Sequence, residues 1–201
     1  WAAAWAEVGT RASAGLAQLS HRLAHPFDAA GVMPLLAEMH RWLAQRPPKL
    51  GSTDYNAYNA IVDPVGTEVH FLEFAKIGWD WTERRLVQYT TSVGSGRADG
   101  RMRSLLDAET ARYYAEMGGR ADGARALEYH RIFFLLNGAA MLCSALDGGP
   151  RAAALLARWK KPERRLRQFA KLLARGLSID PVAVEFRECL QDSLTPDGDR
   201  P

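Results

Sequence analysis

The stretch that decides the fold, GSTDYNAYNAIVDPVGTEVHFLEFAKIGWD, covers residues 51–80. It holds the two strongest strand patterns of the sequence, the apolar runs 61–62 and 69–74, on either side of the turn sequence DPVG at 63–66. β-branched and aromatic residues favour strands, and Pro and Gly favour a tight turn. The pattern predicts a small β-hairpin within residues 60–74.

Helical patterns flank the predicted hairpin on both sides. Residues 1–24 are rich in Ala and have apolar side chains at helical spacing, and Pro26 ends this helix. Asp28 can cap a second helix, which the Pro pair at 47–48 ends. After residue 80 we expect a glycine-containing loop at 94–100 and a frayed tail at 195–201. The further predicted helices are 82–92, 101–117, 122–146, 150–159, 162–176 and 181–191.

These patterns predict an α+β fold, mostly α, in which residues 1–201 form a single domain. The chain of 201 residues has 47% hydrophobic and 24% charged residues, which is typical of a folded protein with a sizeable core. The apolar segment 132–146 contains Asn137 and is too short to cross a membrane, so we interpret it as a buried helix.

Net charge and cysteine content limit the classes of partner and the cellular compartment that we expect. A net charge of +3 suits an anionic ligand such as a nucleotide but is too small to indicate nucleic-acid binding. The two cysteines, Cys143 and Cys189, do not have the spacing of a metal site, and two cysteines are too few for a disulfide framework. Without a secretory signal pattern or an apolar span, we expect a cytoplasmic protein with no membrane partner.

Three polar residues of the 51–80 stretch have the order that phosphoryl transfer requires. Asp54 and Asn59 have the D-x-x-x-x-N spacing with which kinases place, on one loop, a carboxylate for the acceptor hydroxyl and an oxygen ligand for magnesium. Glu73 lies on the far side of the predicted hairpin, which returns the chain to the same place. Magnesium prefers hard oxygen ligands, so Asn59 and Glu73 are candidate Mg²⁺ ligands.

The same stretch resembles the aminoglycoside phosphotransferase and choline kinase-like family, whose fold is protein-kinase-like. STDYNAYNA at 52–60 is similar to the catalytic loop of that family, FLEFA at 71–75 to its metal-binding strand F-I-D-F-E, and IGWD at 77–80 to the G-W-D-D-P that follows. More loosely, residues 129–171 resemble late helices of some members. The resemblance implies the helical C-terminal lobe of such a fold.

By the same resemblance, Asp54 is the catalytic base, and Asn59 and Glu73 hold Mg²⁺ and ATP. Phosphate would pass to a hydroxyl of a small substrate, which is commonly cationic in this family. The sequence departs from the family at Glu73, where Asp is usual, and residues 1–50 read as two helices rather than as a nucleotide-covering lobe. Two forms therefore remain open: a site completed by a separate N-terminal lobe or partner chain, and a degenerate site.

Residues near this stretch have less specific patterns. Asp80 can position the loop by capping the helix after Trp81, or it can contact substrate. Trp79 can pack against the protein or stack on a ligand. His130 lies beside charged residues at a predicted helix start, where we expect polar surface. The basic run 158–171 has an apolar stripe and is interpreted as the solvated face of a packed helix.

A different class of protein is the alternative. The Ala- and Leu-rich helices resemble the C-terminal ligand-binding and dimerisation domain of a TetR-like transcriptional repressor, with residues 122–176 as the dimer face. Such an all-helical domain leaves the strand–turn–strand pattern at 61–74 unexplained. A hairpin at that position therefore distinguishes the two hypotheses.

Overall fold

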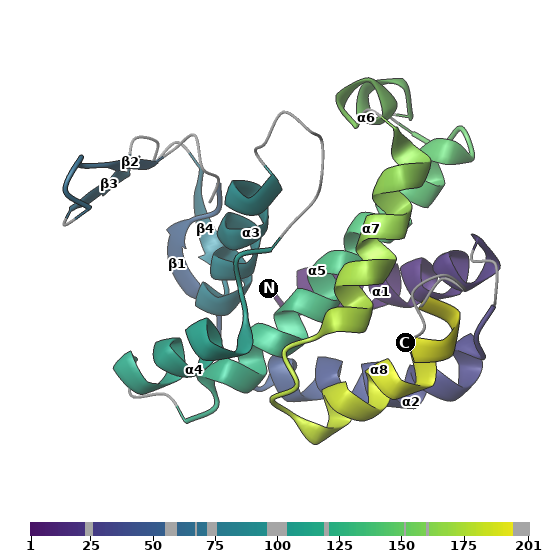
Figure 1. Ribbon diagram of the computed structural model, residues 1–201, viewed down its shortest axis with the longest axis horizontal. Helices are drawn as coiled ribbons and strands as arrows, with labels where there is room; N and C mark the ends of the chain where they lie inside the picture. Colours follow the sequence, from purple (N-terminus) through teal and green to yellow (C-terminus); the bar gives the residue numbers. More distant parts are fainter. Residues whose placement is uncertain are drawn as a thin grey trace.

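The structure, a computed structural model, describes residues 1–22, 26–54, 60–66, 68–71, 76–95, 104–118, 121–150, 152–159 and 161–194. In these residues eight helices and four short strands follow one another, and the strands lie to one side of the helices (Figure 1). The helices are α1 (Ala2–Arg22), α2 (Ala29–Ala44), α3 (Thr82–Ser95), α4 (Ala108–Met117), α5 (Gly123–Leu146), α6 (Ala152–Arg158), α7 (Pro162–Arg175) and α8 (Pro181–Leu194). The strands are β1 (Lys49–Ser52), β2 (Ala60–Val62), β3 (Val69–Phe71) and β4 (Ile77–Asp80). The predicted α+β, mostly α class is confirmed.

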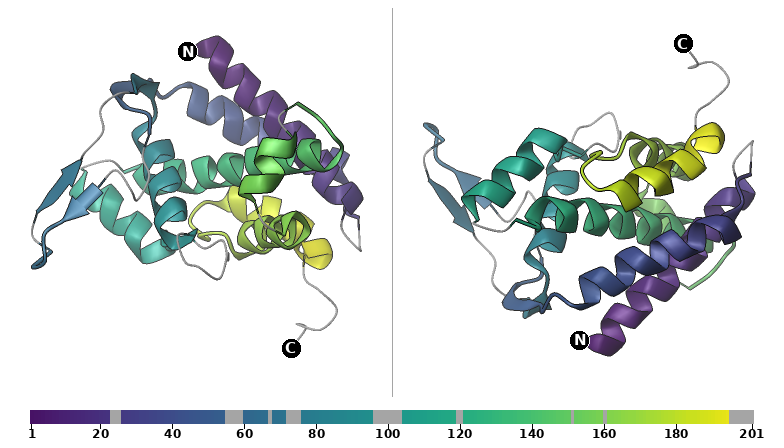
Figure 2. Two further views of the ribbon diagram at one scale, coloured as in Figure 1. Left: turned by 90° about the horizontal axis from the view of Figure 1, so that it is seen from above. Right: turned by 90° about the horizontal axis from the view of Figure 1, so that it is seen from below.

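Helix α5 is the centre of the helical part. It contacts α1, α2, α3, α4, α6 and α7, and it runs through the middle of the molecule in Figure 2. A helix that is surrounded on all sides has apolar residues around its whole circumference, which explains the apolar segment 132–146. That segment is a buried helix, as the sequence predicts. None of the described helices is long and apolar enough to cross a membrane.

Helix boundaries follow the capping residues. Asp28 accepts a hydrogen bond from the Ala30 N–H at 3.0 Å and caps α2, as expected. The helix expected from residue 101 begins only at Ala108, because Asp107 caps it by accepting the Thr110 N–H at 2.8 Å. Helix α3 extends to Ser95, so Gly94 lies in a helix and not in the expected loop. The predicted tail at 195–201 lies outside the described residues.

Several basic residues of α7 lie on its outer side. The helix buries Leu166, Phe169, Leu172 and Leu173, while Arg167 and Lys171 are exposed. This is the arrangement predicted for a helix that packs through an apolar stripe.

The strands form two antiparallel pairs, one nested inside the other. The inner pair is the predicted hairpin: β2 pairs with β3, with Ala60 opposite Phe71. Gly66 in its turn has a positive φ of 76°, a conformation that glycine adopts without steric cost. The outer pair joins β1 to β4, with Lys49 opposite Asp80. Residues 49–80 therefore fold back on themselves twice.

The outer pair was not predicted, because glycines weaken its strand pattern. Gly51 and Gly78 lie opposite each other, and glycine is depleted in strands. The Arg85 guanidinium donates to the carbonyl oxygens of Lys49 at 2.7 Å and Gly78 at 3.0 Å. A Cβ at position 51 would lie 2.3 Å from Arg85 Nη1, so a larger residue there would require the guanidinium to shift.

His130 is buried, and the prediction of a polar surface position was wrong. Its side chain is 1% exposed, and its ring lies 5.6 Å from the Trp5 ring and 5.8 Å from the Trp81 ring. Because other helices surround α5, charged sequence neighbours do not indicate exposure there; Glu128 and Arg131 are buried as well. Burial, with smaller contributions from Arg84 and Arg46, lowers the pKa of His130 well below its usual value.

Candidate functional site

The candidate site lies where β1 ends and β4 is about to begin. The Thr53 N–H donates to the Lys76 carbonyl oxygen at 2.7 Å, and the Thr53 hydroxyl donates to the same oxygen at 3.0 Å. Two hydrogen bonds therefore join the segment that carries Asp54 to the segment that precedes β4. This contact continues the β1–β4 pairing by one step, beyond Ser52 opposite Ile77.

The Asp54 carboxylate lies against the side chain of Lys76. The Lys76 ammonium donates to Asp54 Oδ2 at 2.7 Å, and the Asp54 N–H donates to Ser52 Oγ at 3.3 Å. The Asp54 side chain is 22% exposed, whereas that of Lys76 is 63% exposed. The predicted base is thus a partly buried carboxylate with a solvent-facing ammonium beside it.

Sequence reasoning did not select Lys76. Its sequence signal is slight: it follows directly after FLEFA, the segment that resembles a metal-binding strand. A lysine at that place gives no hint of its partner, because Asp54 lies 22 residues earlier. The β1–β4 pairing brings the two side chains together.

Asn59 and Glu73, the predicted magnesium ligands, lie outside the described residues. The described residues around them are placed: Asp54 and Ala60 bound one short segment, and Phe71 and Lys76 bound the other. Within the part of the chain that is described, no group of three or more His, Cys, Asp or Glu side chains is arranged to hold a metal ion.

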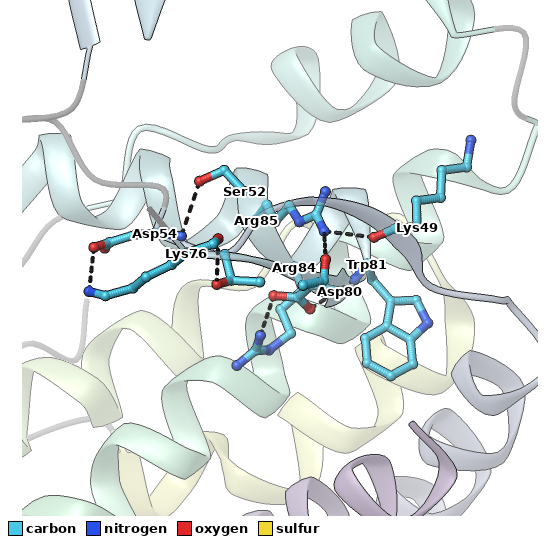
Figure 3. A network of polar contacts seen from close by, with 10 residues as sticks. Lys49, Ser52, Asp54, Lys76, Asp80, Trp81, Arg84 and Arg85 are labelled. Carbon is cyan, nitrogen blue, oxygen red and sulfur yellow. Dashed lines mark hydrogen bonds and ion pairs between the residues drawn. The ribbon is translucent and has the colours of Figure 1, made fainter. Parts of the chain in front are cut away.

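Asp80 holds the junction between β4 and α3. Its carboxylate is buried; Oδ1 accepts the Trp81 N–H at 2.8 Å, and Oδ2 accepts the Arg84 guanidinium at 2.5 Å (Figure 3). Both bonds lie within the first turn of α3 or directly before it. This geometry fits the loop-positioning alternative for Asp80.

The two tryptophans of this segment have opposite environments. Trp81 is buried, and its indole N–H donates to the Arg46 carbonyl oxygen at 2.7 Å. Trp79 is 66% exposed and lies opposite Leu50, which is also exposed. Trp81 therefore packs in the core, whereas the ring of Trp79 is open to solvent and accessible to a ligand.

Comparison with protein-family models, with curated proteins and with solved structures gives no match for this chain. The functional interpretation therefore rests on residues 51–80 and on the geometry of the strands that contain them.

Proposed function

We propose that this chain is the helical lobe of a small-molecule phosphotransferase related to the aminoglycoside phosphotransferases and choline kinases. It would transfer a phosphoryl group from ATP to a substrate hydroxyl, with Asp54 as the base. The observation that carries the proposal is the nested strand pairing of residues 49–80. Phosphoryl transfer depends mainly on positioning and charge, so a scaffold that gathers carboxylates is its first requirement.

The nested pairing supports the proposal through chain connectivity. The inner pair joins Ala60 to Phe71, and the Thr53–Lys76 contact joins the chain again a few residues further out. Asn59 belongs to the segment that connects these two junctions on one side, and Glu73 to the segment on the other side. Both segments therefore run between the Thr53–Lys76 contact and the Ala60–Phe71 pair. This connectivity favours a shared site for the side chains of Asn59 and Glu73.

Asp54 has the environment that a base for a hydroxyl needs. Its carboxylate is held by the Lys76 ammonium at 2.7 Å yet keeps part of its surface exposed. An ionised carboxylate accepts hydrogen bonds and does not donate them, so a substrate hydroxyl can donate to it. In the transfer, the hydroxyl oxygen bonds to the γ-phosphorus, the bond to the bridging oxygen of ATP breaks, and ADP leaves. The hydroxyl proton passes to Asp54.

Asn59 and Glu73 are the side chains that would hold Mg²⁺. An amide oxygen and a carboxylate are the donors that magnesium prefers, so the chemistry of the pair fits the ion. When bound, the ion would neutralise charge on the nucleotide phosphates. The side chain of Glu73 is longer than the Asp that is usual in the family. Activity therefore depends on whether Asn59 and Glu73 together hold the ion.

The repressor-like alternative fits the structure less well. An all-helical domain has no place for the four strands of residues 49–80. That hypothesis also used residues 122–176 as a dimer face, whereas α5 within that range is covered by helices of its own chain. The strands and the buried α5 both favour the phosphotransferase hypothesis.

Magnesium-dependent nucleotide binding tests the proposal. We expect wild-type protein to bind ATP more tightly with Mg²⁺ than with EDTA, and Glu73→Ala to lose that difference. Asp54→Asn should keep nucleotide binding and lose phosphate transfer to a panel of hydroxylated amines, followed by ³¹P NMR. Glu68→Ala is the matched control, because Glu68 is an exposed acid of the same hairpin. Wild-type protein that binds ATP equally with and without magnesium would contradict the proposal.

A further inference from the structure

We propose that Lys76 is the cationic residue that contacts the transferred phosphoryl group. This inference rests on the proposed phosphotransferase function and assigns a further residue to the same site. Charge builds on the transferred group during phosphoryl transfer, and a fixed cation beside it is a recurring part of such sites. The position of Lys76 next to Asp54, rather than a sequence motif, points to this role.

The distances around Asp54 place the ammonium within reach of that group. Lys76 Nζ lies 2.7 Å from Asp54 Oδ2. A hydroxyl that gives its proton to the same carboxylate lies roughly 2.6–3.2 Å from one of its oxygens. The phosphorus under attack lies about 3–3.5 Å beyond the hydroxyl. The ammonium and the attacking oxygen are therefore both neighbours of the Asp54 carboxylate, and the transferred group lies next to that oxygen.

Lys76 combines a fixed backbone with an accessible ammonium. The two hydrogen bonds from Thr53 to the Lys76 carbonyl oxygen fix the backbone relative to Asp54. The side chain remains 63% exposed, so a ligand can approach it. An ammonium carries three N–H donors, so it can contact a carboxylate and a phosphate oxygen at the same time.

The other three cations in the described part of the chain from β1 to α3 have other partners or point elsewhere (Figure 3). Arg84 donates to the Asp80 carboxylate, and the buried Arg85 donates to the carbonyl oxygens of two strand residues. Lys49 is the first residue of β1, and Figure 3 shows its side chain pointing away from the Asp54–Lys76 pair. Of these four cations, Lys76 alone contacts the proposed base.

A comparison of ATP with ADP tests the inference, because only ATP carries the γ-phosphate. Binding of Mg·ATP and Mg·ADP is measured by calorimetry for wild-type protein, Lys76→Met, Lys76→Arg and Lys49→Met. We expect Lys76→Met to weaken Mg·ATP binding by about tenfold or more, the usual effect of losing a hydrogen bond to a charged group, and to leave Mg·ADP binding unchanged. Lys76→Arg should retain most of the affinity for Mg·ATP. Lys49→Met should leave the affinities for both nucleotides unchanged.

Each contrary result has its own meaning. Equal affinity of wild-type protein for Mg·ATP and Mg·ADP would overturn the Lys76 inference and leave nucleotide binding intact. ATP affinity that stays the same or rises in Lys76→Met would also overturn it, because Lys76 would then only occupy or block Asp54. If Lys76→Met lost affinity for Mg·ATP and Mg·ADP equally, Lys76 would have a purely structural role, and the inference would be overturned. Wild-type protein that binds neither nucleotide would overturn the proposed function, and the inference with it.

Discussion

The carboxylate of Glu128 on α5 accepts the backbone N–H of Asp180 at 2.9 Å, although the two residues lie 52 positions apart. It also accepts the N–H groups of Leu177, Ser178 and Ile179, at 2.9–3.0 Å. One buried side chain thus satisfies four consecutive donors in the segment between α7 and α8. Two of the C-terminal helices are therefore positioned by a residue near the N-terminal end of the central helix.

We predict that Glu128→Ala lowers the free energy of unfolding by about 3–5 kcal/mol, since it leaves four donors unsatisfied and removes an acid whose charge favours the charged form of the buried Arg131. Burial lowers the pKa of Arg131 to about 10, while the charge of Glu128 acts to raise it. Urea unfolding measures the loss. Glu185→Ala, an exposed acid of α8, should change the value by less than about 0.5 kcal/mol. Equal losses in the two variants would contradict the anchoring role.

The stability of the protein should fall as the pH drops below about 6.5, the usual pKa of histidine in an unfolded chain. Because the pKa of His130 is lowered in the fold, the unfolded state takes up its proton first, and stability is full only above that pH. The slope is about 1.4 kcal/mol per pH unit while the folded His130 stays neutral. Charging His130 in the fold is opposed by Arg84 and Arg46.

Urea midpoints measured between pH 5 and pH 7 check this prediction. His130→Phe should flatten the acid side of the curve, whereas His21→Asn, at an exposed histidine of α1, should leave it unchanged. If the curve of His130→Phe stays parallel to that of the wild type, His130 does not cause the pH dependence.

Asp80→Ala should lower the free energy of unfolding by about 2–3 kcal/mol, because a buried N–H and a guanidinium lose their acceptor. Loss of this carboxylate also loosens the start of α3, which hydrogen exchange of the first α3 amides can detect. Asp122→Ala is the matched control: its carboxylate is exposed and lies 3.7 Å from Arg46, so we expect less than about 1 kcal/mol. A larger effect at position 122 than at position 80 would refute the assignment.

Gly15→Ala should destabilise the packing of α1 on α5. A Cβ at position 15 would lie 2.2 Å from the Leu136 carbonyl oxygen, and a backbone atom inside a packed helix has little room to move. Overpacking of this kind costs about 1–3 kcal/mol, against about 1 kcal/mol gained from helix propensity. Thermal unfolding should show a lower midpoint for Gly15→Ala and almost no change for Ala14→Ser on the exposed side of α1. A raised midpoint for Gly15→Ala would show that the two helices are free to separate.

Much of the fold is predictable from local patterns. The apolar run of α5, the Asp28 cap and the hairpin around Gly66 depend on residues a few positions apart, and each lies where the sequence places it. The start of α4 was misjudged by several residues, since helix propensity alone does not locate a cap such as Asp107.

The candidate site is predictable only in part. The order of Asp54, Asn59 and Glu73 along the chain indicates phosphoryl-transfer chemistry, and this remains a prediction because two of the three lie outside the described residues. The contact of Asp54 with Lys76 has no sequence signature. The contact depends on the pairing of β1 with β4, and strand propensities do not predict this pair because both strands contain a glycine.

The sequence by itself determined the helices, the inner hairpin and the residue types available for chemistry, because these follow from side-chain periodicity, proline and glycine positions and capping residues. The tertiary structure alone decided which distant groups meet: β1 with β4, Lys76 with Asp54 and Glu128 with the 177–180 amides. It also decided that His130 is buried. The physical reason is that burial and pairing depend on what packs around a residue, and packing joins segments whose separation along the chain carries no local signal.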